Sequence, residues 1–289
     1  MDKSLTQLQI SDANPWCDIE PSGYDLDALQ HLGYLYYSRS APSLAPLLRR
    51  TFSFDVLYQY CEEYSDIINE TRVLGSPADF KNLYIDIRGK TSSIDKGMID
   101  IFSPELSGSN ALPLNLEVLN QIITSLRSYF DVFFDRLNAS YHHSNIYLYR
   151  DVRHPRALHV DSFRRIHYKV FVACDTIQSI DQGPYCFIPK THHQRLRKVA
   201  SIFLNKVLCL VSSSSYHDIN DMLFYRYPDS LKFLPITGEI VVTTHTGVHG
   251  DFPCGAMTTA TRSWILLNYY CRSSSNKWST SLTSNTFCS

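Results

Sequence analysis

The sequence lacks several features that would place it at once in a familiar class of protein. Its 27 basic residues face 28 acidic ones, so no broad positive field exists to attract nucleic acid or an anionic membrane surface. Its eight cysteines include no C-x-x-C pair, which leaves zinc ribbons and thioredoxin-type chemistry without support. No run of about 18 apolar residues could span a bilayer, and the first residues lack the apolar core of a signal peptide. We therefore expect a cytoplasmic protein whose partners are small molecules rather than nucleic acid or membrane.

What the sequence does contain is apolar and aromatic material for a large core. Its 289 residues are 44% hydrophobic and include 19 Tyr and 15 Phe, well above the content of a disordered chain. The length is large for one domain, but β-barrels and β-sandwiches of this size often fold as one. We therefore expect a single domain over 1–289, with a helical N-terminal part over about 1–143, a β-barrel core over about 144–272, a helical insertion in that core over about 194–236, and a loose tail over 273–289.

Hydrophobic periodicity supports this division. The stretch 24–32 has the leucine spacing of a helix that stops at Gly33, before a short aromatic strand. A longer pattern over 116–137 places apolar residues every three or four positions, which predicts a helix packed against a sheet. From position 144 onward the pattern is that of strands rich in Tyr, Val, Ile and Phe, separated by turn residues: 144–152, 156–163, 165–177, 238–252 and 262–274.

The most informative residues are a histidine and an aspartate in the stretch LHVDSF. Successive side chains of a strand point to opposite faces, so His159 and Asp161 should share one side. A third metal ligand is available near the end of the strand GEIVVTTHTGVHGDF, which offers His245 and His249. Two imidazoles and one carboxylate on one face of an octahedral ion leave three positions free, an arrangement that suits non-haem Fe(II) oxygenases.

The order of these blocks resembles that of the Fe(II)/2-oxoglutarate-dependent oxygenases, and more narrowly of the phytanoyl-CoA dioxygenase-like family. The resemblance extends over about 24–270 and implies a mainly β fold with flanking helices, built on a double-stranded β-helix, that is, a jelly-roll or cupin-like core. Its matching pieces are LQHLGYLYY for the opening helix and strand, LHVDSF for the His-x-Asp motif, GPYCFIPKTHH for the family's G-x-x-x-x-I-P-G-S-H turn, GEIVVTTHTGVHGDF for the distal histidine and RSWILLNYY for the arginine strand.

Carried over to these positions, the resemblance assigns four site residues. His159, Asp161 and His249 would bind iron, and Arg262 would pair with the distal carboxylate of 2-oxoglutarate, as a planar guanidinium can do bidentately. His249 is preferred because TGVHG fits the family's T-x-G-x-H-x-G ending. His245 is then expected as a hydrogen-bond donor beside the site or as a substrate contact. The chain departs from the family at Lys190-Thr191, where Gly-Ser is usual.

The function implied is that of a 2-oxoglutarate-dependent dioxygenase using Fe(II), 2-oxoglutarate and O₂. Its substrate would be a small metabolite, oxidised at an unactivated C–H bond and most simply hydroxylated, in specialised metabolism. Halogenation is disfavoured because related halogenases carry Gly or Ala where this chain has Asp161. Desaturation, ring formation and epimerisation use the same iron chemistry and stay open. Two further alternatives are a metal-dependent hydrolase on the same three residues and a non-catalytic binding barrel.

Other residues are candidates without an assigned role. Lys169 alternates with Phe171 and would point either into the barrel or to its outside, while Tyr147 and Tyr149 would either contact 2-oxoglutarate or fill the barrel wall. The sequence identifies neither the substrate nor the oligomeric state. Four arginines flank LHVDSF and would form either a solvated rim or a receptor for an acidic substrate: Arg153, Arg156, Arg164 and Arg165.

Overall fold

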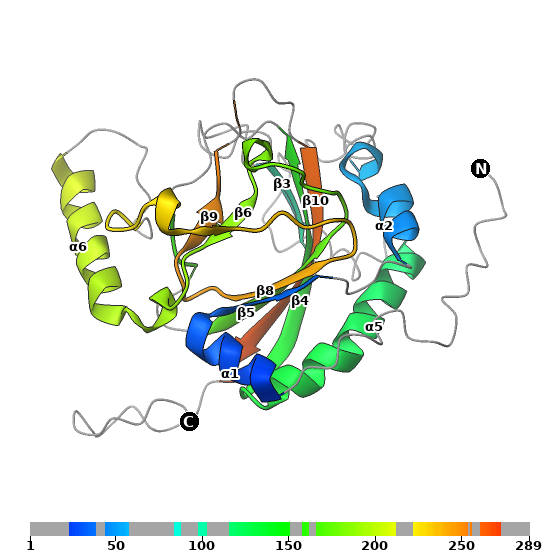
Figure 1. Ribbon diagram of the computed structural model, residues 1–289, viewed down its shortest axis with the longest axis horizontal. Coiled ribbons are helices and arrows are strands. Elements are labelled where there is room, and N and C mark those ends of the chain that lie inside the picture. Colours follow the sequence, from blue (N-terminus) through cyan, green and yellow to red (C-terminus); the bar gives the residue numbers. More distant parts are fainter. Residues whose placement is uncertain are drawn as a thin grey trace.

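The structure is a computed structural model in which two antiparallel sheets are flanked by helices (Figure 1). No described helix is long and apolar enough to cross a bilayer. The residues that the structure describes are 23–38, 44–57, 84–87, 98–102, 116–150, 158–161, 166–211, 222–253, 255 and 261–272.

The larger sheet has seven strands in the order β1-β8-β5-β10-β4-β3-β2, and every neighbouring pair is antiparallel. The long central strands are consistent with the β-branched and aromatic runs of the sequence. The strand bounds are β1 Tyr34–Tyr37, β2 Tyr84–Ile87, β3 Met98–Phe102, β4 Ala139–Arg150, β5 His167–Ala173, β8 Ile240–Thr244 and β10 Thr261–Cys271.

The outer face of this sheet packs against helices and forms the larger hydrophobic core. Helix α5, Leu116–Asp135, is the amphipathic helix predicted over 116–137 and lies along the sheet (Figure 1). Its Phe134 stacks on Tyr269 of β10 at a centroid separation of 4.3 Å and contacts Tyr168 of β5 at 5.1 Å. Every second residue along the central strands β4, β5, β8 and β10 contributes an apolar side chain to this face: Ile146, Leu148, Val170, Val172, Ile240, Val242, Ile265 and Leu267.

Two shorter helices complete this side of the molecule. Helix α1, Gly23–Leu32, ends at Gly33, whose φ of 85° is the left-handed conformation that favours glycine after a helix. The following β1 then pairs with β8, so the N-terminal aromatic strand extends the sheet of the barrel. Helix α2, Ala45–Phe52, adds two buried residues, Leu48 and Phe52, to the same core.

The inner face of the large sheet packs against a small sheet of three strands, in the order β7-β6-β9. These strands are β6 Tyr185–Phe187, β7 Leu231–Lys232 and β9 His249–Asp251. Tyr185 and Phe187 of β6 meet Phe171, Val241 and Trp264 of the large sheet in a second, largely aromatic core. The space between the two sheets is therefore the barrel interior, and it is this interior that receives the histidines of the sequence motifs.

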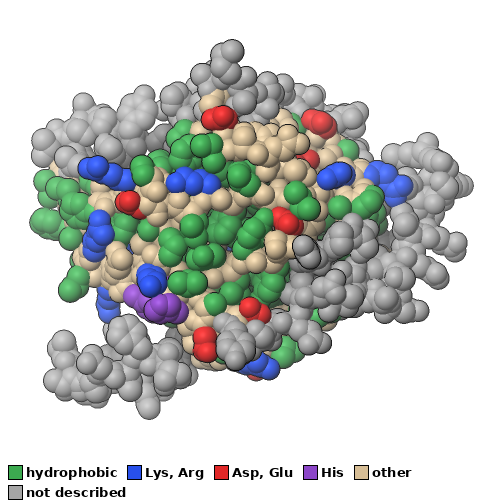
Figure 2. Space-filling model, viewed as in Figure 1, with side chains coloured by type: hydrophobic (Ala, Val, Ile, Leu, Met, Phe, Trp, Pro, Cys, Tyr) green, Lys and Arg blue, Asp and Glu red, His purple; other side chains and the backbone are tan. Residues whose placement is uncertain are grey.

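The chain between β6 and β8 contains helix α6, Arg195–Val211, which stands at one edge of the molecule (Figure 1). Only part of the expected insertion over 194–236 is helical, because its described C-terminal part contains a 3₁₀ turn, Tyr227–Asp229, and strand β7. Apolar side chains gather on the flank where α6 lies (Figure 2). Among its described residues, helix α6 has five exposed large apolar side chains: Leu196, Val199, Phe203, Leu204 and Val207.

Candidate metal centre

The two distant halves of the motif meet through backbone hydrogen bonds. The N–H of His159 donates to the carbonyl of His249 at 2.8 Å, and the N–H of His249 donates back at 3.0 Å. The N–H of Asp161 donates to the carbonyl of His245 at 3.1 Å. The strand expected over 156–163 is not seen in its described part, 158–161, which forms one isolated bridge to β9. Bonds at every second residue nevertheless leave the side chains of His159 and Asp161 on one side, as predicted.

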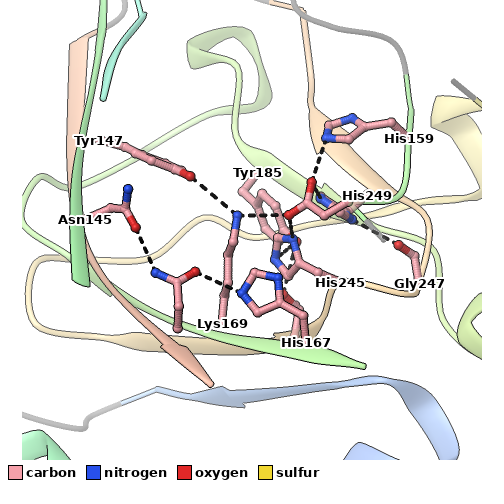
Figure 3. Close-up of polar contacts among 12 residues, drawn as sticks. Asn145, Tyr147, His159, His167, Lys169, Tyr185, His245, Gly247 and His249 are labelled. Carbon is pink, nitrogen blue, oxygen red and sulfur yellow. Dashed lines mark hydrogen bonds and ion pairs between the residues drawn. The ribbon is translucent and has the colours of Figure 1, made fainter. Parts of the chain in front are cut away.

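The structure brings His159, Asp161 and His249 together at one point. Each offers one ligand atom, and these three atoms lie within 4.8 Å of one another. Oδ1 of Asp161 is 3.5 Å from Nε2 of His159 and 3.5 Å from Nε2 of His249 (Figure 3). Atoms that each lie about 2.1 Å from one ion, at angles of about 90 to 110°, are about 3.0 to 3.4 Å apart. The observed separations are close to this spacing, so the three atoms can share a divalent ion after small movements.

His249 is oriented by the backbone just before it. Its Nδ1 lies 3.0 Å from the carbonyl oxygen of Gly247, so Nδ1 carries the proton and Nε2 is free as a ligand. Gly247 itself is packed against the ring of Phe187, and an added Cβ would lie 2.5 Å from that ring. Glycine at this position therefore allows the backbone between the two candidate histidines to lie against Phe187, and the carbonyl of the same residue orients His249.

The second oxygen of Asp161 is held by different partners. Oδ2 accepts a hydrogen bond from Nδ1 of His245 at 2.5 Å and forms an ion pair with Nζ of Lys169 at 3.0 Å (Figure 3). The two carboxylate oxygens therefore have different partners: Oδ1 faces the imidazoles of His159 and His249, and Oδ2 faces Lys169 and His245. Burial alone would raise the pKa of the Asp161 carboxyl, but Lys169 and the surrounding imidazoles outweigh it and hold that pKa well below its usual range. The carboxylate is therefore ionised and ready to bind a cation.

Lys169 points into the barrel, which resolves the choice that the sequence left open. Its side chain is 10% exposed, and Nζ also lies 3.4 Å from the hydroxyl of Tyr147. The Asp161 carboxylate outweighs the effect of burial and raises the pKa of Lys169, so the ammonium is charged. Sequence reasoning did not assign this residue because alternation shows that Lys169 and Phe171 share a face without showing which face is inside.

A second set of possible ligands overlaps the first. Asp161, His167 and His245 also offer three atoms within 4.8 Å of one another. However, Nε2 of His167 already pairs with Oδ1 of Asn268 at 2.9 Å, and the ammonium of Lys169 occupies the same carboxylate oxygen that this set would use. A divalent ion there would be repelled by the adjacent cation. The first set fits a metal better, and His245 has the place of the outer hydrogen-bond donor expected from the sequence.

The departure at Lys190-Thr191 has a structural account. Lys190 has a φ of 64°, the left-handed conformation in which glycine is favoured. Thr191 is buried; its hydroxyl donates to the carbonyl of Ile188 at 2.7 Å and accepts from the N–H of Val248 at 2.8 Å. The threonine thus ties this turn to the residue before His249. It supports the position of the candidate ligand without contacting it.

Arg262 lies on β10 and is almost fully buried, with a side chain 3% exposed. Its guanidinium lies over the ring of Tyr149 at 4.2 Å from the centroid, and Nη1 donates to the carbonyl of Gln182 at 3.2 Å. Nη2 is 2.8 Å from Oδ1 of Asp251, yet among the described residues neither Nε nor Nη2 has a partner in hydrogen-bonding alignment. A buried guanidinium that still has N–H groups without an aligned acceptor is suited to receive a carboxylate, although Asp251 already pairs with Nη2. The motifs do not predict that Asp251 lies beside Arg262.

Two other groups of candidates have simpler outcomes. Tyr149 stacks under Arg262, and Tyr147 contacts Lys169, so both line the interior. The four arginines that flank LHVDSF, Arg153, Arg156, Arg164 and Arg165, lie outside the described residues.

Comparison with known proteins supports the architecture. No family model matches the sequence, and no curated protein matches it. The crystal structure of EvdO2 from Micromonospora carbonacea var. aurantiaca is similar with a TM-score of 0.52 and 14% identity, covering 86% of this chain and 91% of that one. AviO1 from Streptomyces viridochromogenes Tue57 gives a TM-score of 0.50 and 14% identity, covering 87% and 95%. A structure of EvdO2 complexed with 2-oxoglutarate gives 0.48 and 14%, covering 87% and 91%. The chain therefore shares the fold of these structures, two antiparallel sheets flanked by helices, which is the double-stranded β-helix arrangement predicted from the sequence.

Proposed function

We propose that this protein is a Fe(II)- and 2-oxoglutarate-dependent dioxygenase that oxidises an unactivated C–H bond of a small metabolite in the cytoplasm. The observation that carries the proposal is the convergence of Oδ1 of Asp161 with Nε2 of His159 and Nε2 of His249. Two imidazoles and one carboxylate are the donor set of non-haem iron oxygenases, and they leave coordination positions open. Hydroxylation in specialised metabolism is the outcome that we favour.

The residues present fit both the metal and the cosubstrate. The carboxylate is ionised, and the side chains of His159 and Asp161 are 13% and 25% exposed, so small molecules can reach the centre. Arg262 supplies a buried cation for a carboxylate of the keto acid, and its Nε and Nη2 have no aligned hydrogen-bond acceptor among the described residues. The binding of 2-oxoglutarate by EvdO2, which has a similar fold, adds support from outside the chain. A metal hydrolase would use the same three ligands but has no need of a buried arginine.

In the reaction, the side chains of the protein would orient the metal ligand Asp161 and keep water away from the reacting centre. Bound Fe(II) with 2-oxoglutarate would supply O₂ activation, which protein side chains cannot. Lys169 and His245 hold Oδ2 of Asp161, so the carboxylate presents one oxygen to the metal and leaves room for the cosubstrate, O₂ and substrate. Phe171, Tyr185 and Trp264 close the interior with apolar surface and limit water around the reacting centre.

The test is an anaerobic titration of the metal-free protein with Fe(II) and 2-oxoglutarate. We expect the visible charge-transfer band of a chelated keto acid, and its loss in His249→Ala. Absence of the band in a folded wild-type protein that has bound iron would refute the proposal. Arg262→Ala then separates the rivals, because an oxygenase should lose keto-acid binding and substrate-stimulated succinate release, while a hydrolase should keep its activity.

A further inference from the structure

The proposed cosubstrate anchor already has a carboxylate beside it. Asp251 ends β9, two residues after His249, and its Oδ1 lies 2.8 Å from Nη2 of Arg262. The side chains of Arg262 and Asp251 are 3% and 16% exposed, so solvent screens this pair only weakly. The positive charge that would attract the distal carboxylate of a keto acid is therefore largely compensated within the protein.

The position of Arg262 does not depend on Asp251 alone. The Tyr149 ring lies under the guanidinium, and the carbonyl of Gln182 accepts from Nη1. The pair also lacks hydrogen-bond alignment at Nη2, which a bidentate arginine–carboxylate bridge would have. Two contacts that do not involve Asp251 therefore help to hold the guanidinium in place, and the ion pair adds a negative charge beside it.

A keto acid with two carboxylates would meet both members of this pair. Arg262 attracts its distal carboxylate, and Asp251 repels it from a few ångströms away. A keto acid of the same length without a distal carboxylate would feel neither effect. The two ligands therefore differ in one interaction only, and Asp251 acts on that difference.

We propose that Asp251 sets the selectivity of the keto-acid pocket, weakening its preference for a dicarboxylate such as 2-oxoglutarate over a monocarboxylate keto acid of equal length. The inference rests on the proposed function, because it places the distal end of the cosubstrate at Arg262. It adds a residue that determines which keto acids the pocket selects and how tightly.

The experiment compares two ligands across matched variants. Calorimetry under anaerobic conditions gives the Kd of 2-oxoglutarate and of 2-oxopentanoate for the Ni(II)-loaded wild type, Asp251→Asn and Asp251→Ser. We expect both variants to bind 2-oxoglutarate roughly tenfold more tightly, because one nearby like charge is gone, while the Kd of 2-oxopentanoate stays unchanged. Asp229→Asn removes one charge from an exposed position and should alter neither Kd. Nickel affinity is measured in each variant, because Asp251 is close to His249 in the chain.

The outcomes separate the inference from the function on which it rests. If the wild type binds 2-oxoglutarate and both variants bind it equally well or more weakly, the inference is wrong and the proposed function stands. If both keto acids shift by the same factor, Asp251 acts through the metal, and the inference is again wrong. If the nickel-loaded wild type and variants bind neither keto acid, the proposed function fails and the inference fails with it.

Discussion

The two faces of the large sheet are made by alternate residues of the same strands and serve opposite purposes. On the outer face of β5 and β10, Val170 and Leu267 are opposite each other in an apolar core under α5. One position along, Lys169 is opposite Asn268 on the inner face. Both layers are buried, but the outer one gains by removing hydrocarbon from water, while the inner one holds polar groups that need partners.

The inner face satisfies its polar groups through a connected network. Asn268 accepts from His167 at 2.9 Å and donates to Asn145 at 2.8 Å, while Lys169 links Asp161 to Tyr147 (Figure 3). Such groups do little for net stability beyond offsetting their own desolvation. Substitutions on the outer face should therefore change stability alone, and substitutions on the inner face should change what the site binds.

The largest effect is expected for Asp161→Ala, whose carboxylate lies in the barrel interior and pairs with Lys169 of the inner face. It removes a ligand atom, so the Kd for Ni(II) should rise by more than the roughly 100-fold that loss of an outer partner causes. Lys169 is also left as a buried cation without its carboxylate. Calorimetry with Ni(II) measures the affinity, and the double variant with Lys169→Met removes the stranded charge as a control. Nickel binding at wild-type strength in either variant would place the metal elsewhere.

In the core between α5 and the outer face, Phe134→Ala should produce the largest loss of stability. Its ring is fully buried and contacts Tyr269 and Tyr168, so truncation should lower the free energy of unfolding by about 3 to 5 kcal/mol. Urea unfolding checks this value. Nickel affinity of the folded variant should equal that of the wild type, and a joint loss of both would show that the two faces are coupled.

How far the sequence predicts this molecule depends on the range of the interaction. The helix over 116–135 and the end of α1 at Gly33 follow from local periodicity and backbone conformation, and both were predicted. The meeting of His159 with His249 was predicted through the order of motifs in a known family, because spacing alone cannot bring distant segments together. The strand expected around LHVDSF forms only a bridge, since its pairing with β9 is brief.

Contacts of side chains to which the family's motifs assign no role were not predicted. The inward direction of Lys169 depends on which face of β5 meets the small sheet, and the pairing of Asp251 with Arg262 depends on how β9 lies against β10. Neither follows from alternation, which gives relative faces only. The polar contacts around the three predicted ligands are therefore the part of the molecule that the sequence does not determine.

A smaller effect is expected for Lys169→Met, which should lower the stability of the metal-free protein and yet increase its affinity for Ni(II). Without metal, Asp161 loses its cationic partner, so stability should fall by about 1 to 3 kcal/mol, less than for a fully buried pair because Asp161 is 25% exposed. With metal, the ion at Oδ1 supplies the positive charge that Asp161 needs, and removal of the nearby ammonium at Oδ2 should tighten Ni(II) binding roughly tenfold. The rise in melting temperature on adding Ni(II) should therefore exceed that of the wild type. Lys206→Met, on the exposed side of α6, is the matched control and should behave as wild type.

The smallest effect concerns pH and again belongs to the inner face. Burial, with Lys169 nearby, lowers the pKa of His167 to about 3, whereas an unfolded histidine titrates near its ordinary value of 6.5. Below that value the unfolded chain takes up a proton that the folded protein refuses, so stability present at neutral pH is lost as the pH falls toward 3. His143 and His192, with pKa values of about 4 lowered mainly by burial, contribute to the same dependence of stability on pH.

The side chain in His167→Gln can still donate to Asn268 but cannot titrate, so only part of this pH dependence of stability should disappear. Urea unfolding with a chelator at about pH 7 and about pH 5 measures it. An unchanged difference between the two pH values would mean that His167 is protonated in the folded protein and that the network has another arrangement.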